Sequence, residues 1–296
     1  MKKIFVIGGT TFDHIISLAD FPKPIPQTIH QAEFNETVGS TGSGKSLCFT
    51  KLKMPNKLYS VLGNDVYGRK IIDFLKSNQV DFIYDFDEKG TERHVNLMNS
   101  DGERISIFIT QSCEKPKISF EKIETEITNS DVIILNIISY CKELIPLVSA
   151  SEKPIWTDLH DYDEGNEYHE PFIEAADYIF LSSDNLTDYR KTMTKLIQRD
   201  KKLIVCTHGK KGSTSLDSSG IFFDLPALTS YELKDSNGAG DNYFSGFLYA
   251  FYQNKTIEEC MKYGAICGAE CITSEQLVSE KLNPKYLEEV YEKQYG

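Results

Sequence analysis

The chain has 296 residues, 40% of them hydrophobic and 26% charged, a balance typical of a folded globular protein and too apolar for a disordered one. Its 44 acidic and 32 basic residues give a formal net charge of −12, which argues against nucleic acid or an anionic membrane as the main partner. No apolar run reaches the roughly 18 residues of a membrane span. The seven cysteines show neither disulfide nor zinc spacing, so we expect reduced thiols in the cytoplasm.

Short apolar runs and amphipathic stretches alternate along most of the chain. The predicted strands are Lys3–Ile7, Leu58–Leu62, Val132–Leu135, Ile155–Asp158, Tyr178–Leu181 and Leu203–Cys206. The predicted helices are Tyr67–Asn78, Cys141–Ala150, Leu186–Gln198, Asp241–Tyr252 and Ile257–Thr273. Because the strand runs are continuously apolar, both faces of the sheet should be covered. The pattern predicts an α/β fold with a mostly parallel central sheet, in a single domain over residues 1–296.

Two segments depart from this rhythm. Thr28–Val38 and Arg93–Ile109 alternate polar and apolar residues, and the second carries a hairpin signal at Asn99-Ser100-Asp101-Gly102. Alternation indicates one wet and one dry face, so we expect a small β-sheet lid over a cleft, from about residues 14–38 and 92–110. The alternative is an antiparallel edge of the main sheet.

The segment Asp235-Ser236-Asn237-Gly238-Ala239-Gly240-Asp241 precedes a predicted helix and carries the chemistry. Gly238, Ala239 and Gly240 at a helix start let backbone N–H groups converge on an anion, aided by the helix dipole. Asp241 would repel a stored phosphate. A carboxylate at this place makes sense if it takes the proton of a hydroxyl that attacks a phosphoryl group.

These residues resemble the C-terminal signature of the PfkB/ribokinase family of carbohydrate and nucleoside kinases, close to Asp-Thr-x-Gly-Ala-Gly-Asp. Four further landmarks, which follow in the family's order along the chain, are Gly8-Gly9 with Asp13, Val61–Gly68, Asp101-Gly102-Glu103-Arg104 and Thr207–Gly212. The resemblance implies a ribokinase-like three-layer α/β/α fold and an ATP-dependent kinase.

The resemblance also implies roles for individual residues. Asp241 would be the general base, with Gly238, Ala239 and Gly240 as the anion hole, joined by Asn237 on the nucleotide side. The implied substrate-binding residues are Asp13, Gly39, Ser40 and Gly44. The implied residues of the ATP side are Ser182, Thr207, Gly209, Gly212 and Gly268, with the helix Tyr263–Gly268 closing over the adenine.

Two departures from the family's pattern bear on function. Ser182-Ser183-Asp184-Asn185 stands where the family has Asn-x-x-Glu, tied to Mg²⁺, so Asp184 or water would take over the role of that Glu and no metal ligand is assigned. Mg²⁺ itself is still expected, because it offsets the charge of ATP. Gly44 stands where the family has a substrate-contacting Asn, which predicts a different sugar specificity.

The pattern Gly39–Ser46 also fits a P-loop, GxxxxGK[ST], with Lys45 on the γ-phosphate. A P-loop should follow a buried parallel strand, whereas residues 31–38 are polar and alternating. The favoured interpretation is therefore a substrate loop in which Lys45 binds a substrate anion or developing phosphoryl charge. Asp158, His160, Asp161 and Asp163 mimic a metal site, but we expect loop acids that are solvated or capping, with Asp158 facing the cleft.

The sequence thus predicts an ATP- and Mg²⁺-dependent kinase for a hydroxyl of a sugar or sugar-like molecule. The alternatives are a nucleoside kinase of the same fold, a P-loop NTPase, or a non-catalytic sugar or nucleotide sensor. The expected partner is a small sugar or nucleoside, and the resemblance adds a homodimer through the lid.

Overall fold

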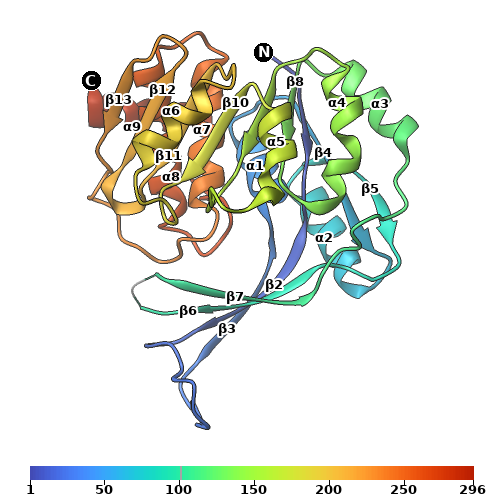
Figure 1. Ribbon diagram of the computed structural model, residues 1–296. Coiled ribbons are helices and arrows are strands. Elements are labelled where there is room, and N and C mark those ends of the chain that lie inside the picture. The colour runs from blue at the N-terminus through green and yellow to red at the C-terminus, as the bar shows by residue number, and fades with distance from the viewer. Residues whose placement is uncertain (101) are drawn as a thin grey trace.

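The computed structural model describes residues 1–100 and 102–296 as a layered body with a second, smaller sheet projecting from it (Figure 1). The main sheet, in spatial order, consists of β13 (Phe222–Leu225), β12 (Ser213–Asp217), β11 (Leu203–Thr207), β10 (Tyr178–Ser182), β9 (Ile155–Asp158), β8 (Val132–Leu135), β1 (Ile4–Ile7), β4 (Asn56–Gly63) and β5 (Asp81–Asp87). Neighbours from β11 to β5 run parallel, and β12 and β13 are antiparallel.

Helices cover both faces of this sheet, and each face has its own apolar core. One core takes side chains from α1 (Thr41–Lys51), α2 (Val66–Ser77), α7 (Ala239–Phe251), α8 (Ile257–Cys271) and α9 (Pro284–Tyr295). The other takes them from α3 (Phe120–Asn129), η1 (Ser139–Leu144), α4 (Ile145–Ser149), α5 (Glu170–Ala175) and α6 (Tyr189–Ile197). Two short turns of 3₁₀ helix, η2 (Glu167–His169) and η3 (Gly209–Lys211), complete the described helices. The predicted three-layer α/β/α body is confirmed.

The small sheet has the order β3 (Glu33–Gly39), β2 (Thr11–Ser17), β6 (Arg93–Met98) and β7 (Arg104–Thr110). It is separate from the main sheet, so the alternative of an antiparallel edge is wrong. The N–H of Gly102 donates to the carbonyl of Asn99 at 3.0 Å, which closes the β6–β7 turn. Asp101, part of the predicted turn and of one family landmark, lies outside the described residues.

Most predicted elements form within one or two residues of their expected bounds, and two do not. The helix expected at Cys141–Ala150 is instead η1 followed by the short α4, which has a proline at its start. The helix expected from Leu186 begins at Tyr189, because Asp188 caps it by accepting the N–H of Lys191. The single tryptophan, Trp156, is fully buried, as expected, and lies among the aromatic rings of α7.

Six of the seven cysteines are buried, Cys113 is half-buried, and all seven are free thiols. No helix in the described part of the chain is long and apolar enough to cross a membrane.

Candidate active site

The start of α7 forms an open anion site. Gly238 caps the helix in the left-handed conformation with φ 81°, and a side chain at this position would meet the carbonyl of Leu277 at 2.9 Å. The N–H of Ala239 is bonded to Ser236, whereas the N–H groups of Gly240 and Asp241 have no acceptor among the described residues. No atom lies within 4 Å of a Cβ built on Gly240. Two free donors and the positive end of the helix dipole therefore face open space, as an anion site requires.

Asp241 lies in the first turn of α7, with a side chain that is only 10% exposed. Its Oδ1 accepts a hydrogen bond from the Lys45 ammonium of α1. Its Oδ2 lies against Gly44, where a Cβ would approach to 2.7 Å. The carboxylate is thus fixed on both sides by the α1 residues.

Asp13 of β2 is the second buried carboxylate of the site. Its Oδ1 accepts from the Thr11 hydroxyl at 2.7 Å and its Oδ2 from the Asn96 amide at 3.2 Å, while His94 Nδ1 lies 3.6 Å from Oδ1. Burial raises the pKa of Asp13, and these polar partners oppose the shift. A Cβ on Gly39 would approach Asp13 Oδ2 to 2.1 Å, so the backbone passes very close.

The segment Gly39–Gly44 therefore runs from one carboxylate to the other. It leaves β3 against Asp13, passes through Ser40, whose φ of 74° is rare for a side-chain-bearing residue, and enters α1 against Asp241. Such backbone strain is common at functional sites. Gly39, Ser40 and Gly44, which were predicted to bind substrate, lie in this segment between Asp13 and Asp241.

Lys45 is also in this segment, but its side chain turns inward. The ammonium is fully buried and bonded to Asp241 and, at 3.1 Å, to Oδ2 of Asp158. Gly39–Ser46 leaves β3, which pairs antiparallel with β2 in the small sheet rather than lying in the parallel main sheet, and Lys45 is buried inside the fold rather than at the rim of the loop. The alternative of a P-loop NTPase is wrong.

The residues expected on the nucleotide side line the carboxyl ends of β10 and β11. Ser182 and Thr207 are paired in register there. Gly209 and Gly212 have φ values of 54° and 107°, and a Cβ on Gly212 would meet the Leu225 carbonyl at 2.0 Å, so the tight turn needs glycine. Gly268 of α8 lies against the Ala239 carbonyl, at 3.2 Å from a built Cβ, which brings α8 close to the anion site.

The small sheet reaches the anion site through the tip of its β6–β7 hairpin. The Arg104 guanidinium donates to Asn237 Oδ1 at 2.8 Å, and the Ser236 hydroxyl donates to the carbonyl of Gly102 at 2.9 Å. Both acceptor-donor pairs join the hairpin to the loop that begins α7. These two hydrogen bonds therefore connect the small sheet to the body of the protein beside the anion site.

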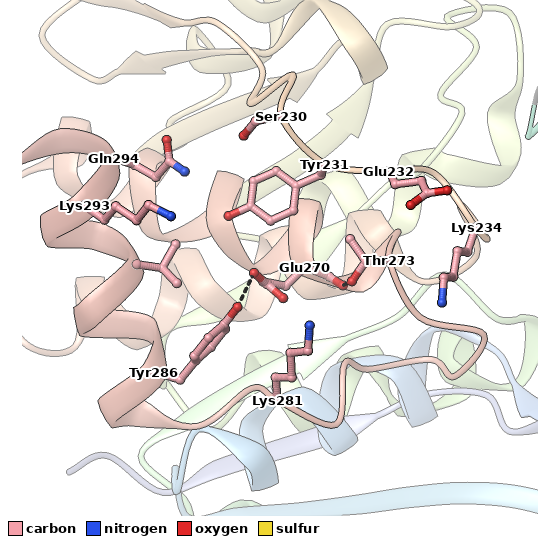
Figure 2. A pocket seen from close by; sticks show the side chains of 11 residues that line it. Ser230, Tyr231, Glu232, Lys234, Glu270, Thr273, Lys281, Tyr286, Lys293 and Gln294 are labelled. Carbon is pink, nitrogen blue, oxygen red and sulfur yellow. Dashed lines mark hydrogen bonds between the residues drawn. The ribbon is translucent and has the colours of Figure 1, made fainter.

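Two hollows lie near these elements. One of about 410 Å³ lies between the small sheet and the loop before α7, and its lining includes Ile15, Phe34, Met98 and Asp235. The other, of about 520 Å³, lies among α8, α9 and residues 230–234 (Figure 2). Glu270 lies at its floor and accepts from Tyr286 at 2.7 Å. None of the predicted site residues lines this second hollow.

Sequence reasoning missed His94 and Asn96, which hold Asp13, and the pairing of Asp158 with Lys45. The first two are polar residues at alternate positions of β6, level with Asp13 and Ile15 across the β2–β6 ladder. Polar residues two apart on a predicted strand indicate a polar face, and that signal was present. Asp158 was expected among solvated or capping acids. It is buried, and it also accepts the N–H of His160 at 3.0 Å.

Comparisons with known proteins point to the same family of kinases that the sequence resembles, and to its fold. The sequence profile of the pfkB family carbohydrate kinases matches residues 163–283. Acarbose 7(IV)-phosphotransferase of Actinoplanes sp. is 29% identical over 91% of this chain and 92% of its own length. The solved structure of a microbiome-derived acarbose kinase has a TM-score of 0.88 at 25% identity, over 97% of this chain and 98% of that one. The ribokinase of Thermotoga maritima shares the fold, with a TM-score of 0.79 at 17% identity over 99% of this chain and all of that one (100%).

Proposed function

We propose that this chain, which is similar to the pfkB family carbohydrate kinases and to acarbose 7(IV)-phosphotransferase, transfers a phosphoryl group from ATP to a hydroxyl of a sugar-like molecule, and we assign the residues that do so. Asp241 is the general base, and Gly238, Ala239 and Gly240 form the anion hole, in which the free N–H groups of Gly240 and Asp241 bind the phosphoryl group in transfer. The observation that carries the proposal is the Asp241 carboxylate beside two free N–H groups at the start of α7.

In this proposal Asp13 orients the acceptor, because its carboxylate is held rigidly by Thr11, His94 and Asn96. The acceptor oxygen forms the new bond to the γ-phosphorus as the bond to the β-phosphate oxygen breaks and ADP leaves. The hydroxyl proton passes to Asp241. The N–H donors stabilise the charge on the equatorial oxygens, which is where catalysis of phosphoryl transfer chiefly acts.

The nucleotide is proposed to lie over Ser182, Thr207, Gly209 and Gly212, at the carboxyl ends of parallel strands where ligands of open α/β sheets bind. Mg²⁺ fits this arrangement as an ion held mainly by phosphates and water, which needs only one or two protein carboxylates. Asp184, whose Oδ2 accepts from the Ser182 hydroxyl at 3.0 Å, is the proposed one. The ion would neutralise phosphate charge.

Acarbose is the first acceptor to test, because two similar proteins bear it in their names and a hollow of about 410 Å³ lies between the small sheet and the loop before α7. We also propose that the small sheet is a lid, since it carries Asp13 on its inner face and touches the α7 loop at its tip. The free thiols favour a reducing compartment, the cytoplasm.

The experiment is ADP release with Mg·ATP across acarbose, pentoses, hexoses and nucleosides, with Asp241→Asn beside the wild type. We expect acceptor-dependent turnover that falls by at least about a thousandfold in the variant, while ATP binding persists because the N–H groups remain. Turnover by the variant within tenfold of the wild type would remove Asp241 from the base role. Binding of both ligands by the wild-type chain with no turnover would favour the sensor.

A further inference from the structure

Lys45 is a lysine buried without any exposed atom, on the face of α1 that packs against α7. Its ammonium bonds to one carboxylate on each side, Asp241 of α7 and Asp158 at the end of β9, and lies 5.0 Å from the centre of the Phe244 ring. A buried ammonium is costly unless it is paired. Two carboxylates and an aromatic face supply that pairing from two elements, α7 and β9.

The charges of this cluster are set by the pairing. Burial would lower the pKa of Lys45, but the Asp241 and Asp158 carboxylates outweigh it and raise the pKa, so the lysine is cationic. Burial would raise the pKa of Asp158, but His160 and Lys45 lower it to about 2, so Asp158 is anionic. The Lys45 cation is thus shared by Asp158 and Asp241, and of these two carboxylates Asp241 lies at the start of α7.

The pairing also distinguishes the two oxygens of Asp241. Oδ1 is bonded to an ammonium that has no access to the cleft. Oδ2 lies beside Gly44, which has no side chain to cover it. The oxygen left to meet an acceptor hydroxyl is Oδ2.

We propose that Lys45 is a positioning residue for catalysis: its ammonium fixes Asp241 through Oδ1 and aims Oδ2 at the acceptor hydroxyl. The inference rests on the proposed role of Asp241 as the base. It differs from the sequence-based expectation that Lys45 binds a substrate anion, because both partners of the ammonium are protein carboxylates.

Other titratable groups around the cluster do not replace Lys45. His160 faces Asp158, with Nδ1 at 3.5 Å from Oδ2. The thiols of Cys48 on α1 and Cys271 on α8 are close enough for Asp241 to affect them, and burial raises the pKa of both, so they are neutral. The free thiol of Cys267 on α8 lies next to the free thiol of Cys48. Lys45 is the one cation that the described residues place on Asp241.

The test is the split between kcat and KM for Lys45→Met, measured with Mg·ATP and acarbose or whichever acceptor the panel identifies. A base that is no longer held by the ammonium meets the acceptor hydroxyl in the wrong orientation, so kcat should fall while nucleotide binding is kept. We expect kcat at neutral pH to fall at least about tenfold, with KM for ATP within about twofold of wild type.

Lys201→Met is the matched control, because Lys201 is also a buried lysine but bonds to the carbonyls of Glu174 and Ala176. It should lower stability while kcat stays within about twofold of wild type. If Lys45→Met does not fold, Lys45→Met/Asp158→Asn removes one charge of each sign and is compared with Asp158→Asn alone. The fall in kcat should appear in that pair too.

The outcomes separate the two proposals. An inactive Asp241→Asn with kcat of the Lys45 variants within about twofold of their reference chains overturns the positioning role and leaves the base in place. A loss confined to KM for ATP overturns it as well, since Lys45 would then serve the nucleotide. An active Asp241→Asn, or a wild-type chain without turnover, overturns both.

Discussion

Gly44 is the residue whose structural role differs most from what its position in the sequence predicts. It stands where related kinases have a substrate-binding Asn, and in the structure its missing side chain makes room for Asp241. A Cβ there would lie 2.7 Å from Oδ2 and 3.1 Å from the Asp241 Cβ, closer than such atoms tolerate. The absence of a side chain at Gly44 therefore leaves room for the carboxylate of Asp241, the proposed base.

Gly44→Ala should separate stability from activity. Alanine in the middle of α1 gains about 1 kcal/mol of helix propensity, which offsets the cost of displacing the carboxylate. The free energy of unfolding should therefore change by less than about 1 kcal/mol, while kcat falls roughly tenfold or more because Oδ2 is moved. Denaturant unfolding and steady-state kinetics measure the two.

Gly165→Ala is the control, since a Cβ there would meet only a side-chain oxygen, at 3.4 Å, in an exposed loop. Equal kcat values for Gly44→Ala, Gly165→Ala and the wild type would show that Asp241 tolerates displacement.

At the scale of elements, the sequence predicted the buried strands well and the packing between elements poorly. β8 and β9 form at the predicted residues because continuous apolar runs can only be covered on both sides. α1 was not predicted, because Gly42, Gly44 and two serines are typical of a loop. In the structure those small residues let α1 approach other backbone closely, with Gly42 against the Gly9 carbonyl.

In the site, too, local features could be predicted from the sequence and contacts between distant residues could not. The anion hole and Asp241 are local in sequence and could be predicted from seven consecutive residues. Lys45, Asp158 and Asp241 meet across 113 and 196 residues of chain, and nothing near Lys45 indicates its partners. The P-loop pattern describes only the order of residues 39–46. The polar and alternating residues 31–38 before it already argued against a P-loop.

The contact between the β6–β7 hairpin and the loop before α7 predicts how well the site excludes water. Arg104→Ala removes the bond to Asn237, which leaves the Ser236–Gly102 bond among those that the described residues make at the hairpin tip. We expect KM for the acceptor to rise about three- to tenfold, as the loss of one exposed hydrogen bond implies. ADP release without acceptor should increase, because a looser lid admits water.

Arg69→Ala on the exposed face of α2 serves as the control for the loss of one positive charge. If both variants have the same acceptor KM and the same background ADP release, the hairpin tip does not close the site.

For the whole molecule, the outer face of the small sheet raises the question of assembly. Phe34, Ile16, Leu97 and Ile105 form one row across its strands, and Ile107 lies in the next row on the same face. Phe34 is 65% exposed and Ile107 is 46% exposed. We propose that two copies pair through this face, since an apolar surface of this kind indicates a protein contact.

Ile107→Glu should therefore convert a dimer into a monomer of 33.6 kDa, because a carboxylate in an apolar interface is costly to desolvate. Sedimentation equilibrium measures the mass. Ile221→Glu, at a 63% exposed position between β12 and β13, should leave the dimer intact. A wild-type chain that sediments as a monomer at micromolar concentration would end the proposal.

The pairing of Lys45 with Asp241 has a consequence for how the chain emerges from the ribosome. Lys45 and Asp158 are made early, whereas α7 follows 196 residues after Lys45. Until α7 covers α1 and β9, the aromatic face around Trp156 lacks its partners and the Lys45 cation has only Asp158. A chain that stops before residue 239 therefore lacks Asp241, the proposed base, and the side chains that α7, α8 and α9 add to one core, a form that chaperones and proteases recognise.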